Sequence, residues 1–312
     1  MFNDLRKSRW NSMEEHMTLK LRQWTSQATL ALLFLAWASL ALAQPPKSKK
    51  VYMVTDMEGV DGIVGEWEDQ CDPFKSPRWA ESHKLLTDEV NAAADGLFQG
   101  GATHVVVADF HDDSRSLSVT DIDPRVRLLQ GRGISPTDEL DPSYAALIFI
   151  GQHAMAGAEN GILSHSFSFK IQNIWVNGRP TGEIGSLVML AGYFGLPAIM
   201  LSGDTAACKE IHQLVTEAEC AEVKSGTSRT GGFLLSHPAA CKLITEKARR
   251  AMERLPEFKA YKVEGPVEVK VEVTVEGQTI IPPREGVERI DARTTIYRGK
   301  NIVDAWLKFK NF

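Results

Sequence analysis

Two carboxylates separated by one residue, Asp56 and Glu58, stand at the end of a short apolar segment. The segment, 51–56, has the composition of a buried strand, and side chains at positions i and i+2 of an extended chain point to the same side. Like charges held that close are costly unless a cation lies between them. Gly59 follows and lets the backbone turn away. The pair therefore indicates either a cation site or an acidic turn exposed to solvent.

Two histidines occupy similar positions further along the chain. His111 follows the apolar segment 104–108 and His153 follows the apolar segment 145–150, each after two intervening residues. A single histidine at a strand end is usually structural. Two histidines that follow separate buried strands favour a shared site with the carboxylates.

A third carboxylate, Glu183, opens a predicted helix shortly after an Asn177-Gly178 turn. A glutamate in the first helical turn is also favoured by the helix dipole, so a structural role stays open. Two divalent metals that share a bridging carboxylate take a mixed set of nitrogen and oxygen ligands. The candidate ligands are Asp56, Glu58, His111, His153 and Glu183.

His165 lies between two serines, in a segment that follows a glycine-containing loop. It could be a further metal ligand or a general acid or base, and a structural surface histidine is the alternative. Four other histidines have settings typical of structural residues: His83, His104, His212 and His237. The chain carries no G-x-S-x-G, phosphate-loop or H-E-x-x-H motif, which disfavours a serine hydrolase or a nucleotide-binding enzyme.

The elements that would position these residues alternate between apolar strands and helical patterns. Strands are predicted at 51–56, 104–108, 145–150, 171–176 and 198–201, and helices at 79–98, 183–194 and from Asp204 to about Glu217. Continuous apolar strands between helices indicate an α/β fold with a mostly parallel sheet covered by helices on both faces. Ligands of such sheets gather at the carboxyl ends of the strands, where the candidate residues fall.

The pattern changes after Gly231-Gly232. Ser236 is a candidate N-cap for a long helix over 238–255, the segment 263–275 alternates as a half-exposed strand does, and a last helix is predicted over 301–309. We therefore predict an α/β metal-binding catalytic domain over 51–231 and a smaller α+β portion over 232–312.

Composition is that of a globular protein. The chain has 312 residues and a mass of 34.5 kDa, with 43% hydrophobic and 24% charged residues, which excludes a disordered chain, a fibre, a coiled coil and a multi-span membrane protein. The net charge of -5 argues against nucleic acid as the main partner. Four cysteines are too few and too scattered for a disulfide scaffold, and all three full pairings stay open: Cys71, Cys208, Cys220 and Cys241.

The N-terminal segment has the pattern of a secretory signal peptide. Sixteen uncharged residues, Ala28–Ala43, follow Lys20 and Arg22 and end in an Ala-Leu-Ala sequence. An uncleaved membrane anchor is the alternative, although sixteen residues span only about 24 Å as a helix. We predict that residues 1–43 are removed, that 44–50 form a polar lead-in, and that the mature protein is periplasmic or secreted and does not contact the membrane.

Six ordered segments resemble the zinc-dependent D-aminopeptidase family. They are VYMVTDMEGVDG (51–62), VVVADFHDDS (105–114), FIGQHAMAG (149–157), GILSHSFSF (161–169), VNGRPTGEIG (176–185) and LSGDTAACKE (201–210). The resemblance extends from about residue 50 to 308 and includes the segments 227–244 and 288–297. Six motifs in the right order make it specific.

The resemblance implies an aminopeptidase that holds two zinc ions and hydrolyses short peptides, with a preference for N-terminal D-residues such as D-alanyl peptides. Asp56 matches the residue that bridges the two ions. Glu58 and His153 match ligands of one ion, His111 and Glu183 match ligands of the other, and His165 matches the catalytic histidine. Family members assemble into homo-oligomeric rings with their active sites facing an inner chamber.

The chain departs from the family pattern at Phe110, where a small residue is usual, and at Thr181, where an apolar residue is usual. Both changes concern the shape of the pocket and therefore the substrate. Two other functions stay open. One is another dinuclear metallohydrolase such as a phosphoesterase, although the nearest arginines, Arg115 and Arg179, do not adjoin the candidate ligands in sequence. The other is an exported binding protein without turnover.

Overall fold

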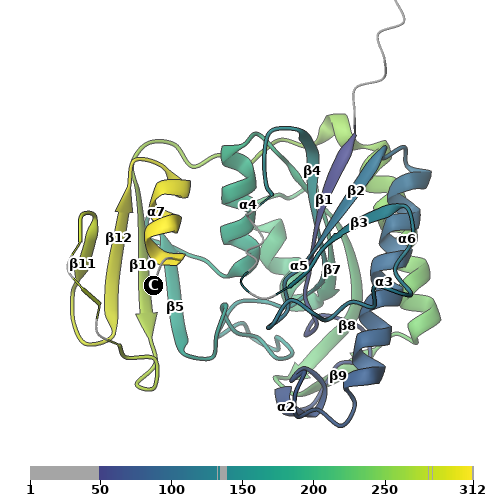
Figure 1. Cartoon of the computed structure of the whole chain (residues 1–312), viewed down its shortest axis with the longest axis horizontal. Helices are drawn as coiled ribbons and strands as arrows, with labels where there is room; N and C mark the ends of the chain where they lie inside the picture. Colours follow the sequence, from purple (N-terminus) through teal and green to yellow (C-terminus); the bar gives the residue numbers. More distant parts are fainter. Residues whose placement is uncertain (1–48, 132, 134–138, 280, 283, 311–312) are drawn as a thin grey trace, which may run out of the picture. The chain divides into compact units, whose positions relative to one another are not determined.

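The computed structural model describes residues 49–131, 133, 139–279, 281–282 and 284–310 (Figure 1). The predicted signal peptide, 1–43, and most of the predicted lead-in lie outside the described residues. Within these ranges, no helix combines the length and the apolar character needed to cross a membrane.

The larger sheet holds seven strands of the described residues. In spatial order they are β3 (Val126–Leu129), β2 (His104–Asp109), β1 (Lys50–Thr55), β4 (Tyr144–Gln152), β7 (Ala198–Asp204), β8 (Glu219–Ser228) and β9 (Gly231–Leu234). The first six run parallel, and β9 is antiparallel to β8 at one edge. The prediction of a mostly parallel α/β sheet is confirmed.

Helices cover both faces of this sheet (Figure 1). One face packs against α3 (Trp79–Gln99) and α6 (His237–Glu253), and the other against α4 (Glu183–Tyr193) and α5 (Thr205–His212). Strand β1 contributes to both cores, because Val51 and Met53 belong to the first and Tyr52 and Val54 to the second. A strand buried on both faces favours apolar residues at consecutive positions, which explains the apolar run 51–54 within β1.

The smaller sheet is antiparallel. Its spatial order is β11 (Val287–Arg289), β12 (Thr294–Gly299), β10 (Val267–Val273), β5 (Ile171–Val176) and β6 (Arg179–Pro180). The tight turn between β5 and β6 uses Asn177 and Gly178, both with positive φ. Helix α7 (Ile302–Lys310) packs on this sheet, and Trp306 belongs to the core that also contains residues of α4.

Several elements differ from the sequence-based expectation. The segment 171–176 is a strand, but it pairs with β10 in the smaller sheet instead of joining the parallel sheet. Helix α6 packs against α3 and covers the parallel sheet, although it follows residue 231. Asp204 caps α5 by accepting a hydrogen bond from the Ala207 amide at 2.8 Å, yet the helix ends at His212. The domain boundary at residue 231 stays a prediction.

Two short helical segments complete the description: α2 (Trp67–Gln70) and a 3-10 turn, η1 (Leu255–Glu257).

The four cysteines are free thiols in the structure.

Candidate metal centre

The candidate ligands meet at the carboxyl edge of the parallel sheet. Asp56 and Glu58 follow β1, while His111 and His153 follow the strands on either side of it, β2 and β4. The chain builds the sheet outward from β1 to β2 and β3, and then returns to place β4 on the other side of β1. The strand order therefore reverses between β1 and β4. Open α/β sheets place their ligand sites there. Glu183, the first residue of α4, joins the same group.

Two glycines let the ends of β1 and β4 approach at backbone distance. The Gly59 amide donates a hydrogen bond to the Gly151 carbonyl oxygen at 2.7 Å. A Cβ on Gly59 would lie 2.2 Å from the Gln152 oxygen, and one on Gly151 would lie 2.2 Å from the Asp56 oxygen. Gly151 also has φ of 71°, which side chains disfavour. The two glycines therefore permit the contact that brings Asp56 close to His153.

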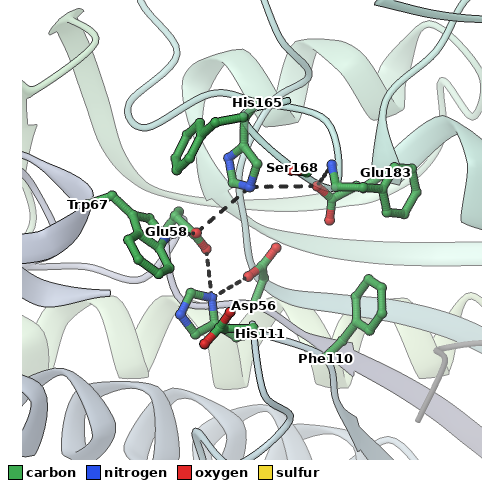
Figure 2. A pocket seen from close by; sticks show the side chains of 11 residues that line it. Asp56, Glu58, Trp67, Phe110, His111, His165, Ser168 and Glu183 are labelled. Carbon is green, nitrogen blue, oxygen red and sulfur yellow. Dashed lines mark hydrogen bonds and ion pairs between the residues drawn. The ribbon is translucent and has the colours of Figure 1, made fainter. Parts of the chain in front are cut away.

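The five side chains form two groups that share Asp56. His111 Nδ1 lies 3.1 Å from both Asp56 Oδ1 and Glu58 Oε2 (Figure 2). His153 Nε2 lies 3.3 Å from both Asp56 Oδ2 and Glu183 Oε1. Each oxygen of Asp56 thus faces a different histidine, as expected for a carboxylate between two cations. In each group the potential ligand atoms all lie within 4.8 Å of one another.

The geometry offers more than one pairing of the ligands. Glu58 lies with His111 in one group and His153 lies with Glu183 in another, while Glu58 also lies with His153 and His165 in a third group, as the resemblance implied for Glu58 and His153. His111 comes from β2 and Glu183 from α4. The roles of the five residues as ligands stay a prediction.

Backbone carbonyls fix which nitrogen each imidazole presents to the cluster. His111 Nε2 lies 2.8 Å from the Cys71 oxygen, and His153 Nδ1 lies 2.9 Å from the Ala154 oxygen. A carbonyl oxygen only accepts, so each of these nitrogens carries a hydrogen, and in the neutral imidazole the other nitrogen keeps its lone pair. Metal-binding histidines are held in this way. His153 Nε2 is buried with no hydrogen-bond partner among the described atoms, which fits a metal ligand.

The buried carboxylates give the cluster an excess of negative charge. Burial disfavours the charged form of His111, but Glu58 and Asp56 outweigh burial and raise the pKa of His111 well above its usual value. Glu183 and Asp56 do the same to the pKa of His153 against the effect of burial. Burial, and then the charge of Glu58, raise the pKa of Asp56. A divalent cation neutralises this negative charge more directly than protons on the imidazoles do.

Three further groups orient the carboxylates, and no sequence pattern indicated their role. Trp67 Nε1 donates to Glu58 Oε1 at 2.9 Å, and Gln152 Nε2 donates to Asp56 Oδ2 at 3.0 Å. The Phe167 amide donates to Glu183 Oε1 at 2.6 Å. Each carboxylate is thus held by a neutral donor and retains lone pairs for a metal. Trp67 reaches the site from α2, a four-residue helix without a clear pattern.

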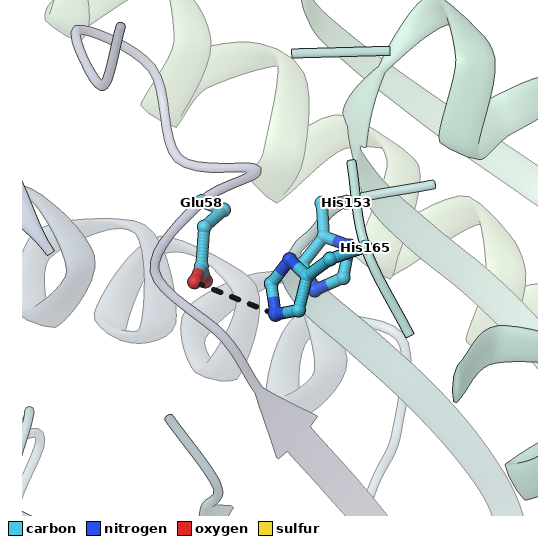
Figure 3. A group of neighbouring side chains, drawn as sticks. All are labelled: Glu58, His153 and His165. Atoms are coloured by element: carbon cyan, nitrogen blue, oxygen red, sulfur yellow. Dashed lines mark ion pairs between the residues drawn. The ribbon is translucent and has the colours of Figure 1, made fainter. Parts of the chain in front are cut away.

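His165 lies beside both groups (Figure 3). Its Nδ1 donates to the Leu163 oxygen at 2.9 Å, and its Nε2 lies 4.0 Å from Glu58 Oε1 and 4.0 Å from Glu183 Oε1. Its ring stacks on that of His153 with centroids 4.0 Å apart. Burial, and then the neighbouring His153, lower the pKa of His165. Because Glu58, His153 and His165 also form a metal-capable group, the geometry accommodates either a ligand or a catalytic role.

A cavity of about 330 Å³ opens above the cluster. Four aromatic side chains form much of its wall: Trp67, Phe110, Phe167 and Phe169. Phe110 therefore does bear on the shape of the pocket, whereas Thr181 is buried outside the lining and donates a hydrogen bond to the Arg179 oxygen at 3.0 Å. The described residues that line the cavity include neither lysine nor arginine.

Comparison with known proteins decides the family. The profile of the peptidase M55 family, described as D-aminopeptidase, matches residues 49–310. The chain belongs to this family. The resemblance found in the sequence motifs is thereby confirmed, and the protein is a metallo-aminopeptidase, a hydrolase.

A curated relative and a solved structure support this assignment. The D-aminopeptidase of Bacillus subtilis (strain 168) is 32% identical over 212 residues, which cover 67% of this chain and 76% of the relative. The solved structure is described as a Zn-dependent D-aminopeptidase, DppA, from Bacillus subtilis, a self-compartmentalizing protease. It superposes with a TM-score of 0.78 at 28% identity and covers 84% of this chain and 96% of its own.

Proposed function

We propose that this D-aminopeptidase family member is a dinuclear zinc enzyme that removes N-terminal D-residues, such as D-alanine, from short peptides. The observation that carries the dinuclear part is Asp56, whose two oxygens face two separate histidine–carboxylate pairs. The zinc-dependent relative supports the choice of metal. The preference for D-residues rests on the family and on the curated D-aminopeptidase.

The residues present fit two zinc ions. Glu58 and His111 would hold one ion, His153 and Glu183 the other, and Asp56 both. When bound, such a pair supplies an activated water nucleophile and positive charge that stabilises a developing oxyanion. The hydrogen bonds that Trp67 and Gln152 donate keep the carboxylates oriented.

His165 is proposed as the group that moves a proton during peptide cleavage. Its Nδ1–H is held by the Leu163 oxygen, so the unprotonated Nε2 is the nitrogen that can reach substrate. The lowered pKa of His165, caused by burial and then by His153, keeps the ring neutral near neutral pH and able to accept a proton. The same nitrogen can then donate the proton to the leaving amine.

Metal analysis combined with a substrate panel tests the proposal. The purified protein, reconstituted with zinc, should hold about two ions per chain and cleave D-alanyl dipeptides faster than L-alanyl dipeptides. N-acetylated dipeptides should be inert and serve as the control. One ion per chain would contradict the dinuclear site, and equal rates on both enantiomers would contradict the D-preference.

A phosphoesterase is the alternative within metallohydrolases. Among the described lining residues none is a lysine or arginine that could hold a phosphate, which disfavours this alternative. Hydrolysis of p-nitrophenyl phosphate by the zinc-loaded protein, at rates above those on D-alanyl dipeptides, would favour it. A binding protein without turnover would cleave neither compound.

We further propose a homo-oligomeric ring and export of the protein. The self-compartmentalizing relative supports the ring, and analytical ultracentrifugation tests it, with a monomer as the contradicting result. The apolar segment Ala28–Ala43 supports export. N-terminal sequencing of the exported protein should begin at Gln44; an intact N-terminus in the membrane fraction would contradict cleavage.

A further inference from the structure

One carboxylate that lines the cavity above the metal centre is not a candidate metal ligand. The acidic lining residues of the cavity are Asp56, Glu58, Asp112 and Glu183. Three of these belong to the groups that share Asp56, and Asp112 does not. Within the described part of the chain, no hydrogen bond or ion pair engages the Asp112 side chain, which is exposed to solvent. Asp112 is therefore available to a molecule that enters the cavity.

The charge of the cavity wall favours a cationic end of the substrate. A peptide carries a positive ammonium group at one end and a negative carboxylate at the other. The described lining residues offer no lysine or arginine to the carboxylate, whereas Asp112 offers a negative charge beyond those required by the metals. An enzyme that cleaves next to a free amine needs a group that recognises that amine, because charged hydrogen bonds are among the strongest in water.

We infer that Asp112 binds the α-ammonium group of the substrate's N-terminal residue and so makes the enzyme selective for free N-termini. The inference rests on the proposed function, since it assumes that a peptide occupies the cavity. Asp112 and the candidate ligand His111 line the same cavity, so an ammonium group bound to Asp112 lies in the cavity that opens onto the metal centre. In an N-terminal residue only the Cα separates the amine from the scissile carbonyl carbon, so one cavity must receive both groups.

The loop that carries Asp112 is held in place before substrate arrives. The Ser114 amide donates to the His111 oxygen at 2.9 Å, and Asp109 Oδ2 accepts from the amides of Ser116 at 2.7 Å and Leu117 at 3.0 Å. Asp112 itself has φ of 44°, in the left-handed region that aspartate and asparagine tolerate better than most residues. A preformed loop lowers the entropic cost of binding.

The neighbouring Asp113 provides a matched control. Its carboxylate pairs with Arg115 at 2.5 Å and lines a separate cavity of about 180 Å³ beside Phe74 and Trp79. D113N therefore removes the same charge one residue along the chain without touching the proposed ammonium site. D112N keeps the size of the side chain and the tolerance for positive φ, so its fold should be preserved.

The experiment compares two zinc-binding probes that differ by one amine. D-alanine hydroxamate and propionohydroxamate are titrated calorimetrically into the zinc-loaded wild type, D112N and D113N, with zinc content measured for each. We expect D112N to lower the affinity for D-alanine hydroxamate about tenfold and the affinity for propionohydroxamate less than about twofold. D113N should change neither affinity by more than about twofold.

Each other outcome has a distinct meaning. An equal loss of affinity for both probes in D112N would overturn the inference, because Asp112 would then act through the metal centre. Unchanged affinity for D-alanine hydroxamate would also overturn it, because the amine would be bound elsewhere. If neither probe bound the wild type and D-alanyl dipeptides were not cleaved, the proposed function itself would fail.

Discussion

The ammonium group of Lys224 donates a hydrogen bond to the main-chain oxygen of Glu58 at 2.6 Å, across 166 residues of sequence. It also donates to the oxygens of Val60 at 2.8 Å and Ile63 at 2.7 Å. Lys224 lies on β8 and is buried, and burial lowers its pKa to about 8. One buried cation thus holds the loop that carries a candidate metal ligand.

Loss of this cation should loosen the metal centre. K224M removes the ammonium donor from three carbonyl oxygens, of which the Val60 oxygen keeps a hydrogen bond from the Ile63 amide at 3.3 Å. Each oxygen left unsatisfied costs about 1–3 kcal/mol. We expect a melting temperature lower by about 5–10 °C and faster loss of zinc to a chelator. The measurements are thermal unfolding and zinc release in the presence of EDTA.

Lys242 is an exposed lysine on α6, so K242M serves as the control and should match the wild type in both measurements. A K224M protein that melts lower but releases zinc at the wild-type rate would mean that Lys224 stabilises the fold without positioning Glu58.

Sequence adjacency explains why much of the site was predictable. Asp56, His111 and His153 each follow a buried apolar strand, and the carboxyl ends of parallel strands lie at one edge of the sheet. The residue types and the strands were therefore sufficient to bring three candidate ligands together. The α/β class followed from the same apolar strands, since both faces of the sheet are covered.

Contacts between distant segments explain why the rest was not predictable. Strand β5 pairs with β10 through residues such as Val176 and Val269, which are far apart in sequence, so its pattern alone could not assign it to the second sheet. Lys224 and Trp67 reach the site only through tertiary packing. The pairing of ligands depends on which side of Asp56 each strand approaches, and no local pattern encodes that direction.

The shared position of Asp56 predicts an uneven effect of ligand removal on metal content. D56A should lose about two zinc ions per chain, whereas E58A and E183A should each lose about one, because Asp56 belongs to both the group with His111 and the group with Glu183. Zinc content after dialysis, measured by atomic emission, checks this. D95A, at an exposed carboxylate on α3, is the control. Equal losses in all three variants would contradict a bridging Asp56.

Glu89 predicts a pH dependence of stability. It is buried on α3, accepts a hydrogen bond from the Asp61 amide at 2.9 Å, and has its pKa raised to about 8 by burial and then by Asp61. The folded state holds this proton up to about pH 8, whereas the unfolded chain releases it above its usual value of 4.5. Stability therefore falls as pH rises through this window, by at most about 1.4 kcal/mol per pH unit.

E89Q should remove that dependence, because its neutral amide can still accept from Asp61. The melting temperature of E89Q relative to the wild type should rise from pH 5 to pH 8. E253Q, at an exposed glutamate on α6, should follow the wild type throughout. Parallel curves for E89Q and the wild type would show that Glu89 ionises normally in the folded protein.

Experiment can distinguish a catalytic role of His165 from a role as a metal ligand or as a structural residue. The five candidate ligands already supply both groups around Asp56, and His165 Nε2 stands 4.0 Å from the nearest oxygens of Glu58 and Glu183. A proton-transfer group contributes typically about 10²–10⁴-fold to rate. We therefore expect H165A to keep its zinc and nearly its melting temperature, yet to lose at least about a hundredfold in kcat.

The control is H104A, an exposed histidine at the start of β2, which should leave all three quantities unchanged. A sixth ligand would instead show loss of one zinc in H165A. A structural histidine would show lower melting with kcat per folded molecule nearly unchanged, because the stacking of His165 on His153 would then be its main contribution. Zinc content, melting and kcat must come from one preparation, since only their combination distinguishes a group that moves a proton from one that holds the metal or the fold.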